Sequence, residues 1–329
     1  MSDVKGNVIC IVGMHRSGTS MIARLLHRCG LYLGAEDQIL GPRSGNEDGH
    51  FEHTGFLEIN DALMQHFGGS WYFPPKFEPG WERDGKLEQT RVEARSLVDT
   101  FSGKSPWGWK EPRTTILLSF WKSIVPNVRF VICVRSPLEV AESLAKRDRI
   151  PVERGVFLWH RYTRAAIEGT EDCPRMLIFY DDFFTDTAAE FVRLIDFCGL
   201  PRPSDLSILE TEIRGELRHH RSEVAELLGS ASVPAEHKIM YLGLRALSGR
   251  EPASPAPKNN SAENAGTFLR VLDEFHNHAR LAQLQSELTE KDHELFKLRT
   301  EILNDLRTNH RWAYRMYRNF IKPFRLRQP

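Results

Sequence analysis

Short apolar runs rich in β-branched residues alternate along this chain with longer segments in which apolar residues recur every three or four positions. Val8–Val12 is an unbroken apolar run, which is typical of a strand buried on both faces. Arg129–Val134 and Met176–Tyr180 predict two more strands. Because strands that alternate with helices form parallel βαβ units, the sequence predicts an α/β fold with a parallel sheet flanked by helices.

Helices are predicted where apolar positions return with helical spacing, and glycine or proline marks several of their ends. The predicted ranges are Ser17–Cys29, Phe56–Phe67, Leu87–Phe101, Thr115–Ile124, Leu138–Lys146, Asp186–Phe197, Glu210–Leu228 and His237–Leu247. The first of these stops at Gly30, and its apolar stripe consists of Met21, Ile22, Leu25, Leu26 and Cys29.

Two segments interrupt this pattern. Residues 34–55 are polar and glycine-rich and end in Gly49-His-Phe-Glu-His53. A long irregular segment inside a compact domain is usually functional or disordered. Residues 71–81 are rich in aromatic side chains and proline. They form either a packed lid or loop, or an apolar platform for a sugar ring or other acceptor.

The composition changes near residue 250 and divides the chain. Residues 1–249 form the predicted α/β domain, and residues 250–266, rich in Pro, Ala, Ser and Asn, form a predicted linker. Residues 267–306 are predicted to be helical. The last segment, 307–329, mixes arginines and lysine with aromatic residues. This tail either contacts an anionic membrane surface peripherally or is merely solvated.

A heptad pattern runs through the C-terminal helical segment. Apolar residues repeat every seven positions at Leu281, Leu288, Leu295 and Ile302, with Leu284 and Leu298 at the half-heptad positions. Lys291 and Asp305 occupy the same register and interrupt the seam. The pattern predicts either a coiled coil, which would make a homodimer, or one amphipathic helix folded back on the domain.

Charge and cysteine content narrow the class of protein. The 44 Lys and Arg residues balance 44 Asp and Glu residues, so no nucleic-acid partner is expected. The five cysteines are scattered, which indicates buried reduced thiols rather than disulfides or a zinc site. We find no secretory signal and no apolar run that would span a bilayer. We therefore expect a cytoplasmic protein, peripheral to the inner membrane face if the tail binds it.

The loop between the first predicted strand and helix has the character of an anion site, because the first N–H groups of a helix have no partner within it. Gly13 and Gly18 have the spacing of a nucleoside-triphosphate-binding loop. The lysine that should follow Gly18 is replaced by Thr19, and the positive charge lies inside the loop at Arg16. A nucleotide with fewer phosphates, bound without metal, fits this loop better. The alternative is an ordinary tight turn.

Arg16-Ser-Gly-Thr-Ser20 resembles the phosphosulfate loop of the sulfotransferases that use 3′-phosphoadenosine 5′-phosphosulfate (PAPS). The family pattern continues with a strand-end arginine and a serine eight residues later, and Arg135 and Ser143 match it. A helix starting near Leu138 places Ser143 about two turns in, where its hydroxyl could reach the phosphate that Arg135 grips. The order of landmarks resembles bacterial sulfotransferases from Val8 to about Arg221.

The resemblance implies a P-loop-like fold, PAPS as cofactor and transfer of a sulfuryl group to a hydroxyl or amine of a small molecule or glycan. The cofactor-binding residues would be His15, Arg16, Ser17, Gly18, Thr19, Ser20, Arg135 and Ser143. Leu217–Arg221 is similar to a late family segment that closes over the cofactor.

Three catalytic roles follow from the same resemblance. Arg16 would neutralise the departing phosphate, and Lys110 would steady the sulfuryl oxygens. Glu52 is the predicted base that takes the acceptor's proton. His50 is the second candidate, and His53 lies in the same segment.

Two further features have structural interpretations. Arg113 is predicted to form a structural pair with Glu111. The histidines lack the spacing of metal ligands with acids or cysteines, so no metal is expected.

Two other functions stay open at this point. A nucleotide or small-molecule kinase would need Mg²⁺ and the lysine that Thr19 replaces. A non-catalytic interaction protein would use the coiled coil as its active part, but the intact set of Arg16, Arg135 and Ser143 disfavours a decayed nucleotide site.

Overall fold

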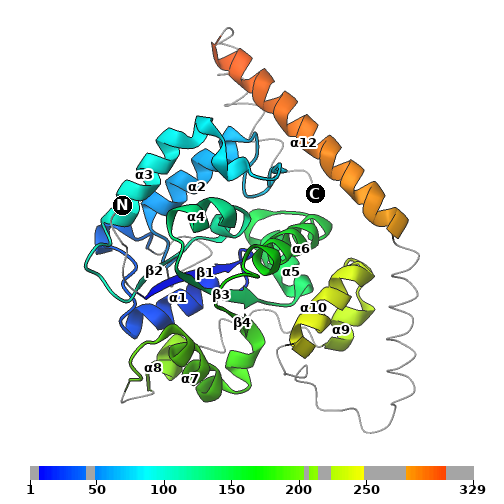
Figure 1. Cartoon of the computed structure of the whole chain (residues 1–329). Coiled ribbons are helices and arrows are strands. Elements are labelled where there is room, and N and C mark those ends of the chain that lie inside the picture. Colours follow the sequence, from blue (N-terminus) through cyan, green and yellow to red (C-terminus); the bar gives the residue numbers. More distant parts are fainter. Residues whose placement is uncertain (1–6, 42–48, 204–206, 214–223, 248–278, 309–329) are drawn as a thin grey trace. The chain divides into compact units, whose positions relative to one another are not determined.

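The computed structural model describes residues 7–41, 49–203, 207–213, 224–247 and 279–308 (Figure 1). These residues form two compact units. The first contains the described residues up to Leu63 and those from Glu78 to Leu247. The second contains Met64–Phe77 and the helix α12, Ala279–Thr308. The predicted linker at 250–266 and the tail at 309–329 lie outside the described residues, so the predicted division into segments stays a prediction.

Four parallel strands form the sheet of the first unit, as the alternation of strands and helices predicts (Figure 1). The strands are β1 Val8–Gly13, β2 Trp107–Lys110, β3 Val128–Val134 and β4 Arg175–Phe179, in the order β2-β1-β3-β4. The predicted central strand is confirmed, and all six residues of β1 are buried.

The sequence did not predict β2, because Trp-Gly-Trp-Lys lacks a β-branched run. Gly108 explains how this strand joins the sheet. A Cβ at this position would lie 2.1 Å from the carbonyl oxygen of Ile9. Glycine is therefore what permits the two backbones to approach so closely.

The strand order places a topological switch at the centre of the sheet. From β1 the chain continues to β2 on one side, whereas β3 lies on the other side and is followed by β4. In open α/β sheets, ligands bind outside the carboxyl ends of the strands at such a point. Here Gly13, which ends β1, is paired with Cys133 near the end of β3. The segments that follow these two strands therefore begin side by side.

Ten helices of the first unit connect and cover these strands in the part of the chain that is described. They are α1 Thr19–Arg28, α2 Thr54–His66 (which runs on into the second unit), α3 Glu88–Asp99, α4 Leu118–Ile124, α5 Pro137–Asp148, α6 Val152–Gly169, α7 Thr187–Cys198, α8 Ser207–Glu212, α9 Val224–Gly229 and α10 Ala235–Leu247. Short 3₁₀ turns lie at Glu36–Gln38, Trp81–Arg83, Gly85–Leu87, Pro112–Ile116 and Tyr180–Phe184.

Apart from helix ends that are shifted by one to three residues, the predicted helices differ from these in two places. The sequence analysis missed α6, although Val156, Trp159 and Tyr162 recur along one face with helical spacing and are buried. The prediction of one continuous helix over Glu210–Leu228 is wrong, because α8 already ends at Glu212. Residues 214–223, which include the Leu217–Arg221 segment, lie outside the described residues.

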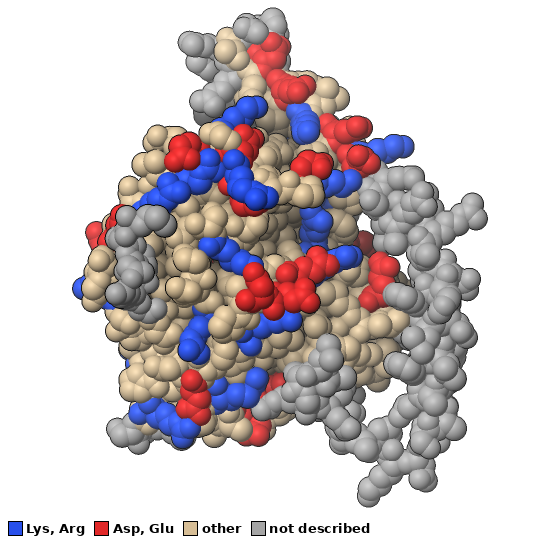
Figure 2. Space-filling model, in the orientation of Figure 1, with Lys and Arg blue, Asp and Glu red and all other residues tan. Residues whose placement is uncertain are grey.

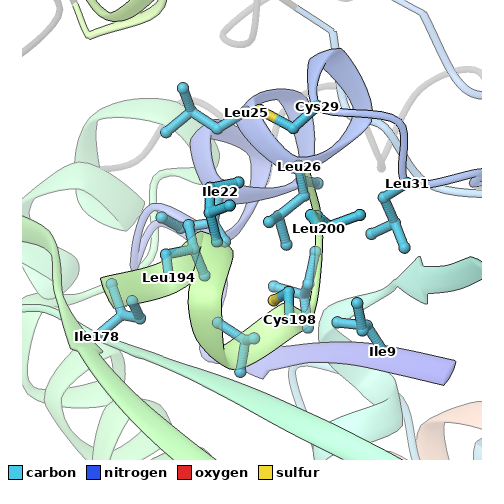
Figure 3. Packing of buried hydrophobic residues seen from close by; sticks show 14 of the residues in the cluster. Ile9, Ile22, Leu25, Leu26, Cys29, Leu31, Ile178, Leu194, Cys198 and Leu200 are labelled. Atoms are coloured by element: carbon cyan, nitrogen blue, oxygen red, sulfur yellow. The ribbon is translucent and has the colours of Figure 1, made fainter. Parts of the chain in front are cut away.

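Helices α1 and α7 cover one face of the sheet with a continuous apolar core (Figure 3). The predicted stripe of α1 lies in this core: Ile22, Leu25, Leu26 and Cys29 are buried, and Met21 packs against them. Burying a leucine or isoleucine side chain stabilises the fold by about 1.5–3 kcal/mol. All five cysteines are free thiols, four of them buried, as the scattered spacing predicts.

Helix α10 docks onto α6 and the end of β4 in the first unit. The Arg245 guanidinium donates to Asp182 Oδ1 at 2.8 Å, and both side chains are 3% exposed. A second contact joins the rings of His160 in α6 and His237 in α10, whose centroids lie 4.2 Å apart. Burial, with His160 nearby, lowers the pKa of His237 to about 3. Burial, together with the charges of Arg164 and Arg161, lowers the pKa of His160 to about 4.

This histidine pair makes the stability of the first unit depend on pH. Both rings are neutral in the folded chain at pH 7, whereas an unfolded histidine titrates near 6.5. The unfolded chain therefore binds more protons between about pH 6.5 and 4, so stability falls as the pH is lowered through that window. We expect the thermal midpoint to fall between pH 7.5 and 5, and to fall less in His237→Phe. His66→Phe, at an exposed position, is the control; an equal slope in all three proteins would contradict the assignment.

Surface charges and helix length complete the description. On the face drawn in Figure 2, Lys and Arg side chains are interspersed with Asp and Glu rather than gathered into one basic patch. Among the described helices, none is long and apolar enough to cross a membrane.

Candidate functional site

The loop that joins β1 to α1 turns back on itself at the carboxyl end of the sheet. Gly13, Arg16 and Gly18 have positive φ angles of 143°, 70° and 88°. Because Gly18 takes this left-handed conformation at the N-cap, α1 starts at Thr19, two residues later than predicted. A Cβ on Gly18 would lie 2.5 Å from the Tyr180 ring, so glycine is required here for space as well as for conformation.

The structure brings the two predicted arginines together. Arg135 Nη1 donates to the backbone carbonyl of Arg16 at 3.3 Å. Arg16 Nε donates to the Ser143 hydroxyl at 2.8 Å. Ser143 therefore contacts the other arginine of the pair, and its predicted contact with a phosphate that Arg135 binds stays a prediction. The three residues span 127 positions of sequence and form one cluster across β1 and β3.

Two residues that the sequence analysis missed hold Arg135 in place. Its Nε donates to Glu139 Oε2 at 2.7 Å, and Glu139 is fully buried. Its guanidinium also lies over the Tyr180 ring, 4.5 Å from the centroid. Arg135 and Glu139 are four residues apart at the start of a helix, and this spacing could have revealed their contact from the sequence.

Several cations crowd this end of the sheet. Burial, together with the charges of Arg147 and Arg135, lowers the pKa of Arg16 to about 10, and Arg16 stays protonated at neutral pH. Burial lowers the pKa of His15 well below its usual value, and the cations Arg113, Arg147 and Lys110 add to this. His15 is therefore neutral at pH 7. A cluster of like charges this close favours a bound anion.

The loop also contains a buried hydroxyl group, that of Ser17. Ser17 is 1% exposed, and no hydrogen bond to its Oγ is found among the described residues. A buried polar group without a partner costs free energy, so such an atom indicates a ligand. Thr19 is buried beside it at the start of α1. The loop therefore provides hydroxyl groups that can donate hydrogen bonds to a phosphate group.

The predicted catalytic lysine and glutamate form a buried pair at the other side of the loop. Lys110 Nζ lies 2.6 Å from Glu52 Oε1 and 3.1 Å from the Ser20 hydroxyl. Lys110 is 1% and Glu52 is 6% exposed. Lys110 therefore connects the first turn of α1 to the segment after it, and it brings the predicted base within reach of the anion loop.

A hydrogen-bond network behind Lys110 fixes the end of β2. Glu111 accepts from Arg113 Nη1 at 2.6 Å and from Asn60 Nδ2 at 2.5 Å. The contact between Arg113 and Glu111 confirms their predicted structural pairing. Arg113 Nε also lies 2.8 Å from Asp61 Oδ1. Burial, with Glu52 nearby, raises the pKa of Glu111. The sequence analysis missed Asn60, whose side chain also accepts from Trp121 Nε1 at 2.7 Å.

The two histidines near Glu52 differ in position. His50 Nδ1 lies 4.0 Å from Glu52 Oε1 and remains close to the predicted base. His53 instead contacts Gln38 Oε1 at 3.2 Å, and its ring packs against Phe56 and Phe101. His53 therefore belongs to the packing of the domain rather than to the site. Within the described ranges, no group of three or more His, Cys, Asp and Glu residues could hold a metal ion.

Comparison with known proteins gives the same picture as the motifs. A family model described as the sulfotransferase family matches residues 8–204, which is more than half of the chain. No curated protein matches the sequence at a significant level.

Several solved structures have similar folds. A sulfotransferase from Mycobacterium avium is 17% identical and covers 66% of this chain and 69% of its own, with a TM-score of 0.42. The sulfotransferase domain of the Synechococcus olefin synthase is 14% identical, covering 84% and 97%, with a TM-score of 0.42. A sulfotransferase from Alicyclobacillus acidocaldarius is 18% identical, covering 75% and 97%, with a TM-score of 0.38. Likeness at this level says nothing about the donor or the acceptor.

Proposed function

The chain belongs to the sulfotransferase family, and we propose that it uses PAPS as donor and transfers the sulfuryl group to a hydroxyl or amine of an acceptor. The observation that carries this proposal is the junction of Arg16 and Arg135 at the topological switch point, where Arg135 Nη1 donates to the backbone carbonyl of Arg16 at 3.3 Å. A nucleotide with phosphate groups at both ends of its ribose needs two such cations near each other.

The residues present fit that donor. The Gly13–Ser20 loop would hold the 5′-phosphosulfate with Arg16, the Ser17 hydroxyl and the N–H groups that open α1. His15 is neutral and lines the same loop. Arg135, oriented by Glu139 and Tyr180, would hold the 3′-phosphate. Ser143 positions Arg16 through the hydrogen bond to its Nε.

The donor supplies the sulfuryl group, and the chain supplies charge and a base. As the acceptor oxygen forms its bond to sulfur, the bond from sulfur to the 5′-phosphate oxygen breaks. Arg16 and the loop N–H groups stabilise the negative charge that builds on that phosphate. The Lys110 ammonium stabilises the sulfuryl oxygens, and the Glu52 carboxylate takes the acceptor's proton. These are the demands of an in-line transfer through a loose transition state.

For the acceptor we propose a carbohydrate or glycoconjugate. The support is the aromatic segment of residues 71–81, since aromatic rings pack well against sugar faces. Three consecutive rings of this segment contact one another, with centroids 5.9 Å apart for Trp71 and Tyr72 and 4.6 Å apart for Tyr72 and Phe73. A cytoplasmic location, with the basic tail on the inner membrane face, is part of the same proposal.

A thermal-shift measurement separates this function from a kinase. At about 100 times Kd, 3′,5′-diphosphoadenosine should stabilise the protein by about 2.7 kcal/mol. This raises the melting temperature by about 5–10 °C for a domain of this size. We expect the shift without Mg²⁺ and unchanged by EDTA, with smaller shifts for ATP and GTP. A larger shift with ATP that requires Mg²⁺ would favour a kinase.

A further inference from the structure

The second compact unit shows which face of α12 packs within the chain. The Phe73 and Phe296 rings stack with centroids 5.1 Å apart, and Lys76 Nζ lies 3.9 Å from Glu290 Oε2. Lys297 lies beside Gly68. When Leu295 is counted as heptad position a, these α12 residues occupy positions b and c. At 100° per residue, that side is opposite to the a and d positions.

The heptad seam of the same helix is therefore left uncovered. Leu295, Leu298 and Ile302 are 63%, 54% and 50% exposed. They are the a, d and a positions of the repeat that the sequence analysis found. Within the second unit, the segment 64–77 packs against the other face of α12, and the choice between a coiled coil and a helix folded back on the domain stays a prediction. Three large apolar side chains in one helical row are typical of an interaction surface.

We propose that this seam binds the seam of a second copy of the chain, and that the two helices run antiparallel. A 3.5-residue repeat of apolar residues is complementary to a copy of itself. The described part of the seam offers only three apolar positions per copy, so we expect a concentration-dependent dimer that Leu281, Leu284 and Leu288, further along the repeat, strengthen.

The two polar residues of the seam decide the orientation. A parallel pair would stack Lys291 on Lys291 and Asp305 on Asp305 in the core, where like charges are costly. In an antiparallel pair, Leu295 of one copy would face Leu298 of the other. Lys291 would then lie one layer of core side chains away from Asp305 of the second copy. The same arrangement places Glu294 and Glu301 of the two copies near each other at the exposed rim. Charge pairs at the exposed rim have little effect, so the Lys291–Asp305 pair in the core determines the orientation of the two helices.

Sedimentation velocity of the full chain tests the surface. We expect a concentration-dependent dimer that Leu298→Asp converts to a monomer. Thr300→Asp is the matched control, because it puts the same charge at an exposed position of the same helix outside the seam. A monomer at all concentrations, or a dimer that Leu298→Asp leaves intact, would overturn the proposed surface.

A charge-exchange cycle tests the orientation. Lys291→Asp and Asp305→Lys should each weaken the dimer about tenfold, and the double variant should recover most of the affinity. Within one straight helix these residues are about 21 Å apart, since each residue rises 1.5 Å. A coupling between them therefore reports contact across the dimer, whereas effects that simply add would exclude the antiparallel arrangement. Neither readout depends on the proposed enzymatic activity.

Discussion

Replacing Arg16 with alanine is expected to weaken binding of 3′,5′-diphosphoadenosine about 10- to 150-fold. The guanidinium is the cation inside the anion loop, and a hydrogen bond between a charged group and its ligand contributes about 1.5–3 kcal/mol. Isothermal titration calorimetry on the full chain measures the loss. Unchanged affinity would show that the loop does not hold the nucleotide.

Two further variants make this result specific. Arg164→Ala removes an exposed arginine whose pairing with Glu168 is a surface contact, so it should change affinity less than twofold. Ser143→Ala removes the hydroxyl that accepts from Arg16 Nε, so it should cause a smaller loss than Arg16→Ala. Because Ser143 acts through Arg16, the double variant should bind no more weakly than Arg16→Ala alone. Additive losses would mean that Ser143 contacts the ligand independently.

Glu52→Gln is expected to retain nucleotide affinity within about twofold and to lower kcat by about 10²–10⁴-fold, the range typical of a lost general base. Isothermal titration calorimetry measures the affinity, and steady-state kinetics at pH 7 measure kcat. Full turnover would exclude Glu52 as the base.

Glu52 is also the partner of Lys110, so a structural role must be separated from the chemical one. Losing one member of a buried ion pair costs about 3–5 kcal/mol, but glutamine keeps an oxygen acceptor for the ammonium at 2.6 Å. We therefore expect a folded variant with a lower melting temperature. Glu36→Gln, at an exposed position of the preceding segment, is the control. If His50→Ala instead abolishes turnover while Glu52→Gln retains it, His50 is the base.

The sequence alone specified the elements that depend on local patterns. The apolar run of β1, the glycines at 13 and 18 and the stripe of α1 lie within about twenty residues of one another, so their meaning does not depend on the rest of the fold. The strand-end arginine, Arg135, was found for the same reason. Where the local pattern is weak, as in the four residues of β2, the element was missed, because its pairing with β1 stabilises it rather than its own composition.

Contacts between distant segments required the tertiary structure. The partner of Arg16 is 127 residues away, and that of Lys110 is 58 residues away. Strand order decides which of many possible partners meet, and the spacing of residues along the chain does not contain that order. The same holds for α12. The heptads showed that a seam exists, but only the structure showed that residues 64–77 pack against the opposite face of the helix within the second unit.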